Sequence, residues 1–193
     1  IVATVLSFAL LFAQHYVAGS NPWVTRLLNT RSLLMTPMTN AYGYHHNRRE
    51  EQGIDPNRDF PYEQQPAQCM ATVAARAVNE LWREHLVQLA ITFHAGMSCI
   101  SYEWGSFNHY AKPADRISPD DTAQVALGAA MSTYAGRFKQ AGMHAARPYP
   151  HKRINDVVYP VHGGMEDFAY AGSWEKGGGS GISRSTCLRV AAE

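Results

Sequence analysis

Short, continuous apolar runs alternate along this chain with segments of helical character, and this alternation constrains the fold more than any other feature. Three runs predict buried strands: Ser32 to Pro37, Leu86 to Phe93 and Ile154 to Tyr159. Around them, the spacing of apolar residues predicts helices over residues 1–16, 67–85 and 118–140. Strands that are apolar throughout are covered on both faces. We therefore expect an α/β fold in which helices flank a mixed, largely parallel sheet.

Turn and capping residues predict where several of these elements begin and end. Gly19-Ser20-Asn21-Pro22 stops the first helix, and a short helical turn is expected over Trp23 to Leu28. The run Ser118-Pro119-Asp120-Asp121 predicts a helix start, with the Ser118 hydroxyl as cap and Pro119 at the first helical position. Residues 40–66 are polar and contain glycine, which predicts a loop.

The composition is that of an ordinary globular domain, with 46% apolar and 17% charged residues. Lys and Arg number 17 and Asp and Glu number 16, a balance that does not favour nucleic acid or an anionic membrane as partner.

The apolar stretch from Ile1 to Phe12 lacks a basic leader and is too short to span a bilayer. It fits a buried helix better, and we interpret the start of the chain as a fragment boundary inside a domain.

The three cysteines, Cys69, Cys99 and Cys187, are too few for a dense disulfide scaffold. No two of them form a C-x-x-C pair, so a structural zinc site is not indicated. Cys99 follows an apolar run and is interpreted as a core thiol. A bridge between Cys69 and Cys187 stays open.

Three polar stretches carry the residues suited to chemistry. The first begins at Arg49 and includes Asn57 and Arg58, the second is His94 after an apolar run, and the third is Tyr159 before Gly163-Gly164. In open α/β sheets ligands bind at the carboxyl ends of strands, so we expect these stretches to meet around His94.

Guanidinium and carboxamide groups suit a carboxylate ligand, and an imidazole suits zinc. Catalytic zinc needs three protein ligands, however, so one histidine does not make a site. A solvated loop with an Asp55–Arg58 pair, a structural His94 and a plain strand tyrosine are the alternatives.

In chain order, these stretches resemble the M14 family of zinc carboxypeptidases. The family pattern of an Arg followed by Gly-Val-Asp-Leu-Asn-Arg-Asn-Phe-Pro is similar to Arg49 and Gly53-Ile54-Asp55-Pro56-Asn57-Arg58-Asp59-Phe60-Pro61. The histidine segment that ends a strand resembles His94-Ala95-Gly96. The tyrosine before a Gly-Gly-x-x-Asp-aromatic turn resembles Tyr159 with the run Gly163 to Phe168. The resemblance extends to about Trp174.

The resemblance implies a carboxypeptidase-like fold and a role for each residue. His94 would be one of three ligands of a single Zn²⁺ ion, the other two coming from a His-x-x-Glu motif upstream. Arg49 would be catalytic, polarising the scissile carbonyl, while Asn57, Arg58 and Tyr159 would hold the carboxylate of the substrate. Glu166 stands where side-chain preference is set, so it either favours a basic C-terminal residue or is a surface acid.

Departures from the family pattern matter as much as the matches. None of the nine histidines is followed by Glu three residues later, and no general-base Glu is recognisable, Glu193 included. His45 and His46 in the polar loop are poor candidates for replacement ligands. We therefore expect residues 1–193 to be a partial catalytic domain with an atypical or flexible tail at 175–193, which binds zinc weakly and has no peptidase activity alone.

Two functions remain open. The first is a fragment of an extracellular or secretory-pathway zinc carboxypeptidase, whose partner is the C-terminus of a peptide or protein. The second is a catalytically inactive M14-like domain that binds such C-termini. A His-x-x-Glu motif upstream of Ile1 would favour the enzyme. The tail could also lie outside the natural protein.

Overall fold

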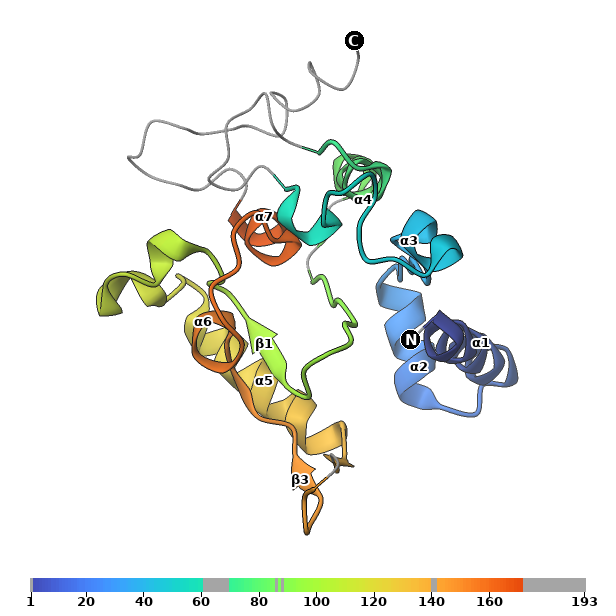
Figure 1. Ribbon diagram of the computed structural model, residues 1–193. Helices are drawn as coiled ribbons and strands as arrows, with labels where there is room; N and C mark the ends of the chain where they lie inside the picture. Colours follow the sequence, from blue (N-terminus) through green and yellow to red (C-terminus); the bar gives the residue numbers. More distant parts are fainter. Residues whose placement is uncertain (1, 61–69, 86, 88, 140–141, 172–193) are drawn as a thin grey trace.

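The computed structural model describes residues 2–60, 70–85, 87, 89–139 and 142–171 (Figure 1). Two helices in contact, α1 (Val2–Ala18) and α2 (Pro22–Thr30), open the chain. Asn21 caps α2, because its side-chain oxygen accepts from the backbone N–H groups of Trp23 (3.0 Å) and Val24 (3.3 Å). The first predicted helix is confirmed, but its expected burial is wrong: none of its residues is buried, and Leu10 is 60% exposed. The expected turn at Trp23 is a full helix.

The described part of the predicted loop at residues 40–66 is more ordered than expected. It contains the helix α3 (Ala41–His46) and the short 3₁₀ helix η1 (Pro56–Arg58). Asn40 caps α3 by accepting from Gly43 N at 2.8 Å. The next helix, α4 (Val73–Glu84), is capped by Thr72. It begins later than residue 67, and the first predicted helical residues, 67–69, lie outside the described part.

Two pairs of strands lie in the second half of the chain. The strands β1 (Ile100–Tyr102) and β4 (His151–Arg153) are parallel, with Ile100 opposite His151. The strands β2 (Arg137–Phe138) and β3 (Arg147–Pro148) are antiparallel. Helix α5 (Asp121–Tyr134) contacts both β1 and β4 (Figure 1). The α/β class is confirmed, with helices against a small parallel sheet.

Four short helical elements complete the described chain. Two are the 3₁₀ helices η3 (Phe107–His109) and η4 (Pro113–Arg116). The helix α6 (Ile154–Val157) follows β4 directly, and α7 (Met165–Ala171) lies beside η1 (Figure 1). This placement brings the turn before α7 next to the loop before α4.

The three predicted strands are wrong. Ser32 to Pro37 has no regular strand structure, nor do residues 87 and 89–93, and Ile154 begins α6. Leu34 and Ile91 are about half exposed, at 50% and 52%. A strand requires a neighbour with which to exchange backbone hydrogen bonds, and among the described residues these apolar runs pair with none. In the last run, Arg153 and Asp156 form an ion pair at 3.6 Å across one helical turn, which favours the helix.

The predicted helix at 118–140 is shorter at both ends. The Ser118 hydroxyl donates to the Gln124 side-chain oxygen at 3.0 Å and does not cap the helix. Asp120 takes the N-cap position without a side-chain capping bond. The helix stops at Tyr134, because Gly136 turns the chain with a φ of 77° into β2.

A buried cluster of mainly aromatic side chains joins the loop before α4, α4 itself and α7. Phe168 is 1% exposed, and its ring centroid lies 5.4 Å from that of Phe60 and 5.7 Å from that of Trp82. The other members are Met70, Ala75, Val78 and Trp104. Because Phe60 and Phe168 each lie within a few residues of the polar stretches, this core holds those stretches together.

Some expectations fall partly or wholly outside the described residues. Cys69, Cys187 and the tail at 175–193 are among these, so the proposed bridge and the nature of the tail are untested. Cys99 is half-buried and unbridged, and burial raises the pKa of its thiol.

Within the described chain no single helix could cross a membrane, although α1 and α2, bent by 100°, together meet the criteria of length and apolar composition.

Candidate functional site

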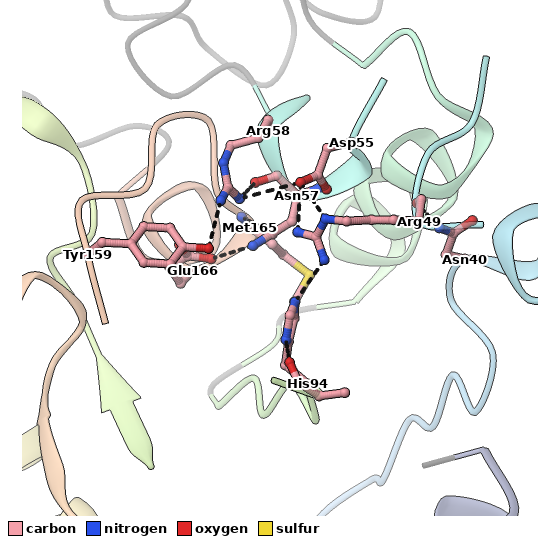
Figure 2. A network of polar contacts seen from close by, with 10 residues as sticks. Asn40, Arg49, Asp55, Asn57, Arg58, His94, Tyr159, Met165 and Glu166 are labelled. Carbon is pink, nitrogen blue, oxygen red and sulfur yellow. Dashed lines mark hydrogen bonds and ion pairs between the residues drawn. The ribbon is translucent and has the colours of Figure 1, made fainter. Parts of the chain in front are cut away.

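Asp55 lies at the centre of a polar network formed by the loop between α3 and α4 (Figure 2). Its Oδ2 accepts from Arg49 Nε at 2.8 Å and is 2.7 Å from Arg49 Nη2, and Arg58 Nη1 lies 3.9 Å away. Its Oδ1 accepts from Asn57 N at 3.0 Å, which caps η1. One carboxylate thus orients both guanidinium groups. The sequence indicated no role for Asp55 beyond a pair with Arg58, whereas its main partner is Arg49.

His94 faces Arg49 although it is not at the end of a strand. Arg49 Nη1 lies 3.3 Å from His94 Nε2, and His94 Nδ1 contacts the carbonyl oxygen of Ala95 (Figure 2). A carbonyl only accepts and a guanidinium only donates. The proton therefore belongs on Nδ1, and Nε2 presents its lone pair toward Arg49. A metal ion would bind His94 through this same Nε2 lone pair, which in this structure is directed at Arg49.

Arg58 connects the loop to Tyr159. Its Nη2 donates to the Tyr159 hydroxyl at 3.4 Å, and its guanidinium carbon lies 5.9 Å from the centre of the phenol ring. Its Nη1 donates to the carbonyl oxygen of Asn57 at 2.7 Å, which fixes the plane of the guanidinium. The Tyr159 residue itself is 53% exposed and so lies at the rim of the site.

Asn57 connects the same loop to α7. Its Oδ1 accepts from Met165 N at 2.9 Å, and its Nδ2 donates to Glu166 Oε2 at 3.5 Å. Glu166 Oε1 is buried and has no hydrogen-bond partner. Burial raises the pKa of this carboxyl, although a backbone hydrogen bond, the Asn57 bond and the charge of Arg58 oppose the shift.

The structure brings together all six residues that the sequence singles out. Contacts join Arg49 to His94, Arg58 to Tyr159 and Asn57 to Glu166. These pairs connect three segments that are far apart in the chain, and the buried aromatic cluster lies beside them. The result is a pair of guanidinium groups held by Asp55, with a phenol and an imidazole at the edges. Its hydrogen-bond donors suit an anionic ligand that can accept several hydrogen bonds.

Two further acids lie beside Glu166, and the sequence gave no signal for them as site residues. Asp167 is 1% exposed and accepts from Gly105 N at 2.9 Å and Ser106 N at 2.6 Å. Burial, together with the charges of Glu166 and Glu103, raises its pKa to about 7. Burial likewise raises the pKa of Glu103. Their spatial proximity comes from the packing of α7 on residues 103–106.

The described residues do not form a complete zinc site. No group of three or more His, Cys, Asp or Glu side chains in this part of the chain is placed to hold a metal ion. His94 is the single predicted ligand that the site contains. His45 and His46 contact each other on α3, with ring centroids 4.8 Å apart, and the ring of His46 contacts that of Tyr42.

Comparison with known proteins assigns the chain to a family. The sequence matches the peptidase M14 family, described as zinc carboxypeptidase, over residues 2–176. Searches among curated proteins and among solved structures found no match. The family match covers most of the 193 residues and all six residues of the polar network. This chain therefore belongs to the M14 family of zinc carboxypeptidases.

Proposed function

We propose that this chain carries the substrate-carboxylate binding site of a zinc-dependent carboxypeptidase that removes C-terminal residues from peptides or proteins. The observation that carries the proposal is the convergence of Arg49, Asn57, Arg58 and Tyr159 beside His94. Such a site suits a group that is anionic, planar and able to accept several hydrogen bonds, as a terminal carboxylate is.

Within this site the two guanidinium groups have different neighbours and thus different proposed roles. Arg58 borders the exposed Tyr159, so its fork binds both oxygens of the terminal carboxylate while the phenol closes over them. Arg49 borders His94, so it lies on the side where the scissile carbonyl would be polarised, and it would stabilise negative charge on that oxygen. Asp55 holds both guanidinium groups in place.

The zinc ion of the family would require ligands besides His94, because catalytic zinc takes three protein ligands. A second function therefore stays open, a non-catalytic domain that binds C-termini with the same carboxylate site. The same geometry supports this function, because it requires only the guanidinium groups that Asp55 orients and the Asn57 carboxamide beside them. The two functions differ in whether the parent protein hydrolyses its ligand. An extracellular or secretory-pathway location remains a prediction.

The test is calorimetric binding of a short peptide with a free C-terminus and of its C-terminally amidated twin. We expect the free acid to bind at least about tenfold more tightly, because the amide removes the charge that the guanidinium groups recognise. Arg58→Lys should abolish most of this preference because lysine lacks the fork. Arg83→Lys, on the exposed face of α4, is the matched control. The proposal is contradicted if the two peptides bind equally tightly, or if neither peptide binds.

A second pair of peptides tests the proposed role of Glu166. Its buried, unpartnered Oε1 supports recognition of a cationic side chain, since a buried carboxylate oxygen without a partner is costly. A peptide ending in Lys is therefore expected to bind more tightly than one ending in Leu, and Glu166→Gln should remove the difference. A preference for Leu removes Glu166 from the substrate site but leaves the carboxylate site standing.

A further inference from the structure

We propose that Glu51 and Asp59 are positioning residues for the carboxylate site, because they fasten both ends of the loop that carries it to the amino end of α4. The inference rests on the proposed function and assigns the two residues that set the geometry of that same site. Neither residue touches the proposed substrate. Each acts through the backbone that presents Arg49, Asn57 and Arg58.

Glu51 fastens the beginning of the loop. It is 5% exposed, and its two carboxylate oxygens lie 2.9 and 3.0 Å from Val73 N. Its Oε2 also accepts from Ala74 N at 3.3 Å. These are backbone N–H groups of the first turn of α4, which have no partner within the helix and carry partial positive charge. Arg49 is only two residues away, so the position of Glu51 limits where Arg49 can lie.

Asp59 fastens the end of the loop. It is 3% exposed, and its Oδ1 accepts from Ala71 N at 3.0 Å. Its Oδ2 accepts from both the backbone N–H and the hydroxyl of Thr72, each at 2.7 Å. Its backbone oxygen accepts from Met70 N at 2.8 Å. Arg58 directly precedes Asp59, and a shift of this carboxylate along the helix end would therefore move Arg58.

Between the two anchors the loop has little freedom. Glu51 and Ile54 exchange backbone hydrogen bonds of 2.9 and 3.0 Å around Gln52 and Gly53, whose φ angles are 52° and 81°. The Asp55 side chain then caps η1. Asn57 and Arg58 thus lie on a short segment held at each end by a buried carboxylate, and Arg49 lies two residues before its first anchor. Binding is tighter when a site is held in its bound geometry in advance.

A role in stability alone makes a different prediction from a role in positioning. If Glu51 only stabilises α4, its loss lowers the fraction of folded protein, while each folded molecule still binds with unchanged affinity. If it positions the site, folded molecules bind the free acid more weakly. Calorimetry separates the two, because stoichiometry reports the folded fraction and the dissociation constant reports the site.

The experiment measures the full chain and its Glu51→Ala and Asp59→Ala variants with the free and amidated peptides. We expect each variant to weaken binding of the free acid about tenfold, with binding of the amide unchanged. Glu51→Gln keeps one acceptor oxygen, so its affinity for the free acid should lie between those of wild type and Glu51→Ala. Glu50→Gln is the matched control, since Glu50 is an exposed neighbour of the same charge.

The outcomes separate this inference from the proposed function. If wild type does not distinguish acid from amide, the proposed function fails and the inference fails with it. If wild type distinguishes them and the variants change only stoichiometry or melting temperature, the inference alone fails. Should the alanine variants not fold, Glu51→Gln against Glu50→Gln decides. Weaker binding of the free acid by Glu51→Gln but not by Glu50→Gln supports the positioning role. Equal dissociation constants for these two variants overturn it.

Discussion

Gly43 shows how closely a single residue is constrained around the site. A Cβ atom at this position would lie 2.3 Å from the carbonyl oxygen of Arg48 and 2.5 Å from Asn40 Nδ2. The same Asn40 side chain caps α3 and donates to the carbonyl oxygen of Arg49 at 2.8 Å. The missing side chain of Gly43 therefore permits the backbone path that leads into Arg49.

Gly43→Ala should consequently affect both stability and carboxylate binding. We expect a loss of about 1–3 kcal/mol, because backbone atoms must move to accept the methyl group, and weaker binding of a free C-terminus. Gly19→Ala is the control, since no atom lies within 4 Å of its Cβ position. Its positive φ of 59° costs about 1–2 kcal/mol without touching the site. Urea denaturation and peptide calorimetry check both effects, and unaltered binding in Gly43→Ala would show that Arg49 does not depend on this turn.

At the scale of the element, the amino end of α4 is the best-satisfied helix terminus near the site. Glu51 accepts from Val73 N and Ala74 N, Thr72 Oγ1 accepts from Ala75 N at 3.2 Å, and Asp59 accepts from Thr72. Three side chains therefore satisfy the N–H groups that every helix leaves open. The start of α4 and the geometry of the preceding loop are consequently one structural unit.

Thr72→Ala removes both the cap of α4 and the hydroxyl that donates to Asp59. We expect a loss of about 1–2 kcal/mol in the free energy of unfolding. Thr72→Ser should retain most of the wild-type stability, because the hydroxyl remains. Thr133→Ala is the comparison, since that exposed hydroxyl only bonds back to Ala129 O within α5. Denaturant titration measures the free energy of unfolding of the three variants. A Thr72→Ala variant as stable as Thr133→Ala would exclude the capping role.

For the whole molecule, three acids couple stability to pH: Glu166 and Asp167 on α7, and Glu103 beside them. Burial raises the pKa values of Glu103, Glu166 and Asp167, the last from 3.8 to about 7. In the window between those two values the folded chain binds more protons at Asp167 than the unfolded chain does. The free energy of unfolding therefore falls as pH rises through this window.

Glu166→Gln should flatten this dependence. The substitution removes one titrating carboxyl and also the charge that helps to raise the pKa of Asp167. We expect the variant to gain stability relative to wild type as pH rises toward about 8, and to gain less at about pH 5, since wild-type Glu166 is more protonated there. Glu80→Gln, on the exposed face of α4, is the control. Thermal melts across this range measure the effect, and parallel curves for Glu166→Gln and wild type would contradict it.

Local patterns were sufficient for part of this description. The helices at the start of the chain and before residue 85 were predicted from apolar spacing, which acts over a few neighbouring positions. The caps Asn21 and Thr72, which set where α2 and α4 begin, were not predicted. The six site residues could be chosen because their types and order resemble a family, which the match over residues 2–176 then established.

What only the tertiary structure decided is which partner each group has. The apolar runs at Ser32 and Ile154 do not form strands, because a strand depends on a neighbour that no local pattern supplies. In the same way, Asp55, Glu51 and Asp59 look like ordinary loop acids in the sequence. Their roles arise from the folding of the loop onto α4 and from the approach of His94 and α7, since hydrogen bonds and charges act through distance in space.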